Sequence, residues 1–237
     1  MSEKIILDAH PSVVIAYSEE AKKLLMSIYD EGYPIPVYRG SANNIGGNPE
    51  PWSISPENVL LEEIAEEFDP NHPEEKKHVG KVPWASSLDI RFIQNALLGA
   101  VSPFQDFYVE VGKISGGHNP HKAIFSTFFS LISGEVIERA ERNIKEDKHL
   151  TTEGLAGVFT LDELIHSPRR EFSTAHATAP ILNYRFESKI PYPKEIVARP
   201  IGPTRRSFSD YLPDYSYNNE NLRKASKAEE FTEKLQN

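Results

Sequence analysis

The stretch "GGNPEPWSISPENVLLEEIAEEFD", residues 46–69, joins a glycine pair to an acidic segment. Ser55 followed by Pro56 is typical of a helix start, with serine as the N-cap and proline at the first helical position. The run predicts a helix that ends before Asp69. Its apolar side chains are expected on the core-facing side: Leu60, Leu61, Ile64, Ala65 and Phe68.

Four carboxylates fall within six positions of this predicted helix, at Glu62, Glu63, Glu66 and Glu67. Like charges three and four residues apart share one helix face and repel each other by roughly a few tenths of a kcal/mol per pair. A divalent cation such as Mg²⁺ would relieve the repulsion, because hard cations bind several carboxylate and carbonyl oxygens. A solvated acidic surface is the alternative, and it is the commoner use of such a face.

The composition limits the classes of function. The 237 residues include 26 Lys and Arg against 35 Asp and Glu, which gives a net charge of −9. This charge disfavours binding to duplex nucleic acid or to an anionic membrane. The absence of cysteine excludes thiolate metal sites and a cysteine nucleophile. We expect a cytoplasmic protein, since the sequence shows neither a signal-peptide pattern nor a run of about 18 apolar residues.

Two further amphipathic helices are predicted. Ser18 followed by Glu19 and Glu20 resembles an N-cap with acids in the first turn, and it predicts an N-terminal helix that ends at Gly32. Residues 86–100, "SSLDIRFIQNALLGA", predict the other helix.

The strand signals are spread along the chain. Residues 106–114 and 122–133 predict strands, and the second is apolar enough to be central in a sheet. Residues 33–40 contain two prolines and predict a short edge strand, followed by a loop over residues 41–55. Residues 134–149 fit a strand, a helix or a mixture of both.

Two later segments carry helix signals. Residues 153–165 predict a strand that runs into a short helix, with Thr160 and Glu163 forming a capping box. Residues 173–186 predict a closing helix that is broken near Pro180.

Residues 46–69 resemble the Nudix box, whose pattern is glycine, five residues, glutamate, seven residues, then Arg-Glu-aliphatic-any-Glu-Glu-any-Gly. By this resemblance Glu63, Glu66 and Glu67 match the three glutamates that bind magnesium or act as base in Nudix hydrolases. Gly47 matches the glycine whose carbonyl often joins the metal shell. Glu153 matches a downstream acid that orients or deprotonates water in some members of the family.

The stretch departs from the box in its loop. One residue is inserted between Gly47 and Glu63, and Glu62 stands at the arginine position. The first glutamate position holds Ser53 or Ile54, depending on the end from which it is counted. The resemblance implies that the two replaced residues form a salt bridge from loop to helix. Both partners of this salt bridge are missing together, so neither charge is left unpaired. We interpret the stretch as a divergent box that retains its metal-binding half and replaces the salt bridge between loop and helix by other contacts.

The resemblance implies an α/β fold with a Nudix-like mixed sheet sandwiched between helices. We expect this domain, with the added N-terminal helix, over residues 1–190, and an extended arm over residues 191–237. The arm would pack on the domain or on a partner subunit, and the second arrangement would give a homodimer.

The implied activity is hydrolysis of a pyrophosphate bond in a nucleoside diphosphate derivative, with Mg²⁺ or Mn²⁺ as cofactor and a small nucleotide-type molecule as substrate. The alternative is a catalytically inactive Nudix-like module that binds a ligand or a protein. His176 is a further candidate, for contact with a substrate phosphate, although helix capping or core packing is the commoner role of such a residue.

Overall fold

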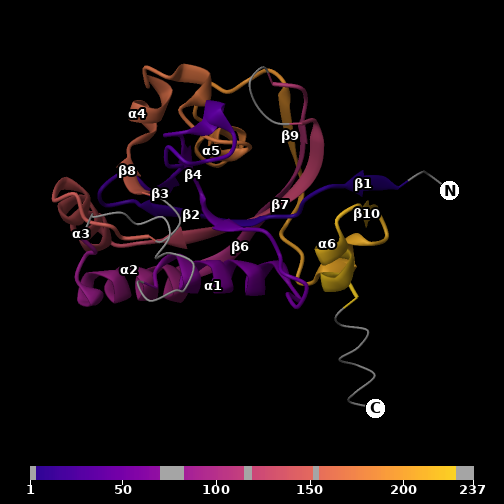
Figure 1. Cartoon of the computed structure of the whole chain (residues 1–237), viewed down its shortest axis with the longest axis horizontal. Coiled ribbons are helices and arrows are strands. Elements are labelled where there is room, and N and C mark those ends of the chain that lie inside the picture. Colours follow the sequence, from indigo (N-terminus) through magenta and orange to yellow (C-terminus); the bar gives the residue numbers. More distant parts are fainter. Residues whose placement is uncertain (1–3, 70–82, 115–118, 152–154, 228–237) are drawn as a thin grey trace, which may run out of the picture.

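The structure, a computed structural model, describes residues 4–69, 83–114, 119–151 and 155–227. A mixed sheet of eight strands lies at its centre, in the order β4-β3-β2-β7-β6-β9, with β5 paired to β2 and β8 paired to β3 (Figure 1). Strands β2 and β7 run parallel, and the other pairs are antiparallel. The strands are β2 (Ser12–Ser18), β3 (Lys23–Ile28), β4 (Ala42–Asn43), β5 (Ile45–Gly47), β6 (Val101–Val111), β7 (His121–Leu131), β8 (Leu155–Phe159) and β9 (Ile196–Gly202).

Helices cover both faces of this sheet (Figure 1). One face packs against α1 (Pro56–Glu67), α2 (Ser87–Ala100) and α3 (Gly134–Lys145). The other face packs against α4 (Leu161–Ile165) and α5 (Thr178–Phe186). The predicted α/β class and the central position of the strand over residues 122–133 are therefore confirmed. In the described ranges, no helix has the length and apolarity that a membrane span requires.

Two predicted helix starts are confirmed by their hydrogen bonds. The hydroxyl of Ser55 accepts a hydrogen bond from the Asn58 N–H at 3.1 Å, so serine caps α1 and Pro56 occupies its first position. Thr160 and Glu163 form the expected capping box at α4, with reciprocal bonds of 3.1 and 2.7 Å. Residues 134–145, for which the sequence left strand and helix open, form α3.

The predicted N-terminal helix is wrong, because residues 12–28 form the β2–β3 hairpin. Ser18 caps a turn here, since its hydroxyl accepts the Ala21 N–H at 3.2 Å. Leu24, Leu25 and Met26 are all buried, but Leu25 belongs to one face of the sheet and its two neighbours to the other. A strand buried on both faces shows a continuous apolar run, which hides its period of two.

Three smaller predictions also need correction. Residues 33–40 contain a 3₁₀ helix, Pro36–Tyr38, in place of an edge strand. The expected loop over residues 41–55 includes the short strands β4 and β5. Pro180 does not break α5, because it lies in the first turn, where its missing N–H removes no intrahelical bond.

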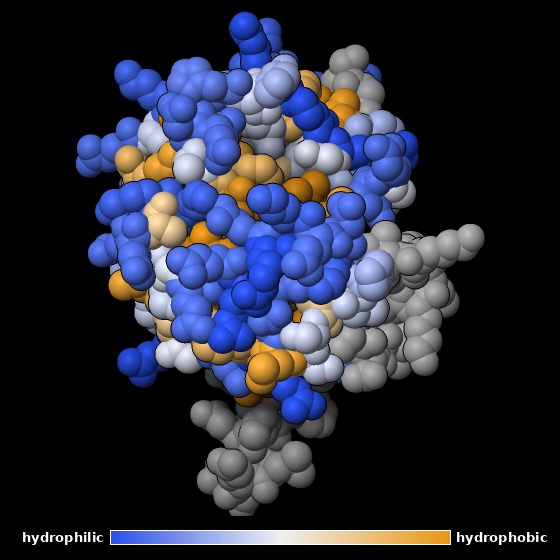
Figure 2. Space-filling view, turned by 90° about the vertical axis from the view of Figure 1, so that its left-hand side faces the viewer, coloured by the Kyte–Doolittle hydropathy of each residue, from blue (hydrophilic) through white to orange (hydrophobic). Residues whose placement is uncertain are grey.

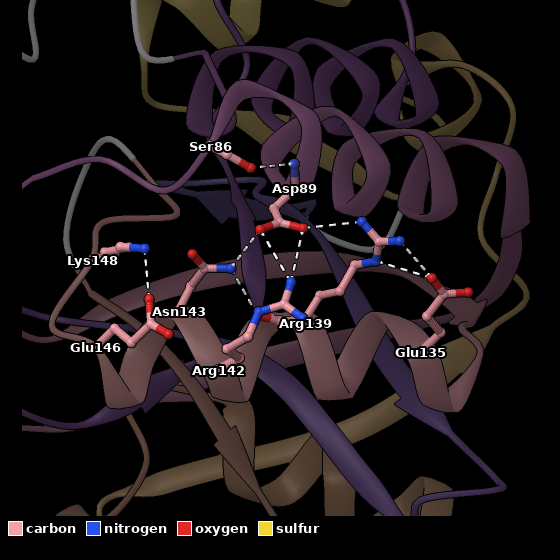
Figure 3. Close-up of polar contacts among 8 residues, drawn as sticks. All are labelled: Ser86, Asp89, Glu135, Arg139, Arg142, Asn143, Glu146 and Lys148. Carbon is pink, nitrogen blue, oxygen red and sulfur yellow. Dashed lines mark hydrogen bonds and ion pairs between the residues drawn. The ribbon is translucent and has the colours of Figure 1, made fainter.

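A charged cluster joins α2 to α3, centred on Asp89 (Figure 3). Its carboxylate accepts hydrogen bonds from Arg139 Nη1 at 3.0 Å, Arg142 Nη2 at 3.1 Å and Asn143 Nδ2 at 3.1 Å. Burial alone raises the pKa of Asp89, but the bonds from Asn143, Arg139, Ser86 and Arg142 outweigh it and hold the pKa below its usual value. The cluster holds α2 against α3, and both helices pack on the same face of the sheet as α1. The side of the molecule that carries α3 is mostly hydrophilic (Figure 2).

The chain after Pro191 packs on the sheet in its described part. Strand β9 pairs with β6, and β10 (Tyr215–Tyr217) pairs with β1 (Ile5–Leu7), close to the short helix α6 (Glu220–Ala225) (Figure 1). The 3₁₀ helix η4 (Phe208–Tyr211) lies between β9 and β10 in the chain.

A buried polar network joins this C-terminal segment to the central strands. The ring of His10 shares hydrogen bonds with Ser126 Oγ at 2.9 Å and with the Tyr217 hydroxyl at 3.0 Å. The Tyr211 hydroxyl donates to Asp106 Oδ2 at 2.7 Å and shares a 3.0 Å bond with Ser126. Removing a partner here would leave a buried polar group unsatisfied, so the network fixes the position of the segment.

Candidate functional site

The glycine pair that opens the predicted box lies directly against the acidic helix. A β-carbon built on Gly47 would lie 2.2 Å from Glu63 Oε1 and 2.6 Å from Glu63 Oε2. Because both distances are far shorter than a van der Waals contact, only glycine at this position lets the carboxylate reach the main chain of β5. The structure thus brings together two residues that are 16 positions apart in the sequence.

Glu67 is held at the same glycine pair. Its side chain is buried, with 6% of the residue exposed. Ser27 Oγ donates to Glu67 Oε2 at 3.1 Å, and the Gly46 N–H donates to Glu67 Oε1 at 3.3 Å. Gly46 itself has a φ of 133°, and a β-carbon there would lie 2.1 Å from the carbonyl oxygen of Ser12. Strands β3 and β5 therefore set the orientation of this carboxylate.

Glu62 and Glu66, the other two glutamates of the acidic cluster, are exposed. Glu66 lies on the solvent side of α1, one residue before the buried Glu67. Glu62 accepts a hydrogen bond from Ser53 Oγ at 3.4 Å, which connects the loop to the helix at the positions where the Nudix pattern has a salt bridge. The acidic residues therefore do not form one uniform face, because α1 turns Glu67 inward.

The oxygen-rich chemistry of this region suits a hard divalent cation. Carboxylates and backbone carbonyls are the ligands that Mg²⁺ and Mn²⁺ prefer. Within the described part of the chain, however, no three His, Asp or Glu side chains converge closely enough to hold a metal ion together. Glu153, the downstream candidate, lies outside the described residues.

A pocket of about 330 Å³ adjoins the glycine pair. Its apolar surface comes mainly from β2 and β7, and its aromatic and polar groups come from segments that are distant in sequence. The residues that line it include Asp8, Val13, Tyr29, Tyr33, His121, Ala123, Phe125 and His176, together with Gly46 and Gly47. The glycine pair thus contacts the acidic helix and also forms part of the pocket.

The aromatic side of this pocket is fixed by hydrogen bonds. The rings of Tyr29 and Tyr33 are stacked, with centroids 3.7 Å apart and planes 7° from parallel. The Tyr33 hydroxyl shares a 3.0 Å hydrogen bond with His176 Nε2. Asn43 Nδ2 donates to the Tyr29 hydroxyl at 2.8 Å, and Thr178 Oγ1 donates to Asn43 Oδ1 at 2.8 Å. Burial raises the pKa of Tyr33, so its phenol is neutral at neutral pH.

The sequence identified only part of this site. His176 was a candidate, and it lies in the pocket. Tyr29, Tyr33 and Asn43 carried no local signal, because their roles depend on contacts with residues far along the chain. Trp52, the aromatic residue inside the box, is 67% exposed.

No protein-family model matches the chain, and no curated protein matches its sequence. Among solved structures it is similar to a crystal structure of MutT protein from Methanosarcina mazei Go1. That likeness covers 79% of this chain and 96% of the other, with 13% sequence identity and a TM-score of 0.40. A likeness of this size does not establish a family or an activity.

Proposed function

We propose that the protein hydrolyses a pyrophosphate bond in a nucleoside diphosphate derivative, in a reaction that depends on Mg²⁺ or Mn²⁺. The observation that supports this most is the position of Glu63 and Glu67. Both carboxylates meet the main chain of Gly46 and Gly47, next to a pocket large enough for part of a small ligand.

The proposed metal ligands are Glu63, Glu66 and Glu67, with the carbonyl oxygen of Gly47. A bound divalent cation would supply charge neutralisation at the phosphates and activation of the attacking water. Ser27 and the Gly46 N–H orient the Glu67 carboxylate before any ligand binds. Glu153 is proposed to position the attacking water.

Charge explains why a cation is needed at this site. A diphosphate is strongly negative, and the nearest side chains on α1 are glutamates. Of the described residues that line the pocket, none is Lys or Arg. Like charges at close range repel, so phosphates can bind beside α1 only if a cation screens the carboxylates.

The test is a hydrolysis screen with millimolar MgCl₂. Nucleoside diphosphate sugars, dinucleotide polyphosphates and oxidised nucleotides are incubated with the protein, and the released phosphate species are identified. We expect turnover of at least one class with Mg²⁺ and none with EDTA. Absence of turnover in every class with both Mg²⁺ and Mn²⁺ would contradict the proposal.

The second candidate is a catalytically inactive module that binds a ligand or a protein without a metal ion. It is favoured by the lack of three converging carboxylates among the described residues. A Mg²⁺ titration separates the two, because a protein that binds the cation gains thermal stability through ligand linkage. The non-catalytic module is expected to show little gain.

A further inference from the structure

The 3₁₀ helix η4 lies against the start of the acidic helix α1. Phe208 of η4 and Val59 of α1 are both buried, and together they form a small apolar cluster. Ser207, the residue before Phe208, donates from its hydroxyl to the Ile54 carbonyl oxygen at 3.5 Å. Ile54 directly precedes Ser55, the N-cap of α1. Two segments 153 positions apart in the sequence therefore meet where the loop after the glycine pair enters the helix.

Val59 gives α1 a second supporting contact. Leu60 and Ile64 belong to the core that α1 shares with the sheet, α2 and α3. Val59 belongs to the separate cluster with Phe208. Glu63 follows Val59 by four positions, and residues with this spacing lie one turn apart on the same helix face. A shift or rotation of α1 at Val59 would therefore move the Glu63 carboxylate, which lies against the glycine pair.

The 3₁₀ helix itself is fixed to the central strands. The rings of Phe208 and His10 meet edge to face, with centroids 4.9 Å apart, and His10 lies just before β2. Tyr211, at the end of η4, donates to Asp106 Oδ2 on β6 at 2.7 Å. A capping box at Ser207 holds the turn of η4 in shape. Because η4 is anchored to the sheet, Phe208 holds α1 at a defined position relative to the strands.

We infer that Phe208 is a positioning residue for the acidic site. By packing on Val59 it fixes the first turns of α1, and through them the carboxylate of Glu63 against Gly47. The effect of this contact on a bound metal ion rests on the proposed function. Its effect on the conformation of α1 does not, since it needs neither a metal nor a substrate.

Hydrogen exchange in EDTA tests the effect on α1 without a metal ion. Phe208→Leu keeps an apolar side chain but shortens the contact with Val59. We expect the amides of residues 60–63, whose acceptors are the carbonyl groups of residues 56–59, to exchange faster by about threefold or more. The amides of α2 and α3, which pack on the same face of the sheet, should change less. An unchanged rate at residues 60–63, or an equal rise in all three helices, would overturn the inference.

Phe107→Leu is the matched control. Phe107 is as buried as Phe208, but it packs on the opposite face of the sheet from α1. The change should lower the unfolding temperature without a selective rise in exchange at residues 60–63. A selective rise in this variant as well would show that the effect is not specific to Phe208, and it would overturn the inference.

Mg²⁺ alone is the probe for the effect on the site. In thermal-shift titrations of the full chain, we expect Phe208→Leu to raise the Mg²⁺ concentration at half-maximal stabilisation by about threefold or more, and Phe107→Leu to leave it unchanged. A purely structural role would lower the unfolding temperature at every Mg²⁺ concentration with the same midpoint, which would overturn the inference. If wild type shows no response to Mg²⁺, the proposed function fails, and the hydrogen-exchange result alone decides whether Phe208 positions α1.

Val59→Ala tests the same contact from the side of the helix, in case Phe208→Leu fails to fold. It should also raise exchange at residues 60–63 selectively. In the double variant the two effects should combine to less than their product, since both changes remove one shared contact. Effects that simply multiply would show that the two residues act independently, and they would overturn the inference.

Discussion

The carboxylate of Glu63 lies against the main chain of Gly47, where a β-carbon would come within 2.2 Å of Glu63 Oε1. This contact joins the acidic helix to β5. It also explains why a glycine is needed here although its φ is not in the left-handed region. Glycine is required because a β-carbon would occupy the space of the Glu63 carboxylate. The contact can therefore be tested by adding one methyl group, as in an alanine variant.

Gly47→Ala is expected to displace Glu63 while preserving the fold. The added methyl group overlaps the end of a flexible side chain, which can turn away at little cost. We therefore expect the unfolding temperature to stay within about 3 °C of wild type. The stabilisation by Mg²⁺ in a thermal-shift titration should fall, because the displaced carboxylate no longer meets the proposed carbonyl ligand.

Gly46→Ala is the matched comparison for this prediction. Gly46 has a φ of 133°, and its added methyl group would lie 2.1 Å from the Ser12 carbonyl oxygen, which is fixed main chain. We expect this variant to lose about 1–3 kcal/mol of unfolding free energy from the strained backbone conformation alone. A Gly47→Ala protein with an unchanged response to Mg²⁺ would argue against Gly47 and Glu63 as metal ligands.

Glu66→Gln is expected to abolish Mg²⁺-dependent turnover without loss of stability. The side chain is exposed on α1, and the repulsion from its neighbouring glutamates falls by roughly a few tenths of a kcal/mol. Glu57→Gln changes another exposed acid of the same helix, away from the glycine pair, and should retain activity. Hydrolysis rates and chemical denaturation of both variants check the prediction. Full activity of Glu66→Gln would remove it from the mechanism.

The sequence predicted the parts of the fold that depend on local signals. Ser55 and Pro56 locate the start of α1 because capping and proline geometry act within one helical turn. The strand over residues 122–133 was recognisable because an apolar run of that length needs cover on both faces. The approach of Gly47 to Glu63 could be predicted only through the resemblance to the Nudix box.

The remaining features depend on contacts between distant segments. The alternation of Leu24, Leu25 and Met26 between two cores is invisible where every residue is apolar. The inward turn of Glu67 depends on the Ser27 hydroxyl, 40 positions earlier. The aromatic pocket depends on Tyr33 meeting His176, 143 positions later. No periodic pattern or short motif reports such pairs.

Asp89→Ala is expected to weaken the packing of α2 against α3. The change removes the common acceptor of Arg139, Arg142 and Asn143, and we expect a loss of about 1–3 kcal/mol, since hydrogen bonds to a charged group are involved and the arginines remain partly solvated. Glu135→Gln is the control, because its exposed pair with Arg139 should contribute less than about 1 kcal/mol. Equal losses in urea denaturation of the two variants would contradict the assignment of Asp89 as the centre of the cluster.

Asp106→Asn is expected to change how stability depends on pH. Burial raises the pKa of Asp106 to about 6, although hydrogen bonds from Tyr211 and Ser126 act in the opposite direction. Because the folded state holds this proton more tightly than the unfolded state, the contribution of Asp106 to stability is complete below pH 4 and is lost as the pH rises to about 6.

Burial lowers the pKa of His10 to about 3, so the contribution of the neutral His10 is lost as the pH falls from 6.5 towards 3. Since His10 is present in both proteins, subtracting the unfolding free energy of wild type from that of Asp106→Asn isolates the aspartate. That difference should rise by roughly 3 kcal/mol between pH 4 and pH 7. The asparagine keeps an acceptor for the Tyr211 hydroxyl and has no charge to bury, so the variant should lose less stability than wild type as the pH rises to 7. Parallel pH profiles for the two proteins would show that Asp106 does not titrate in this range.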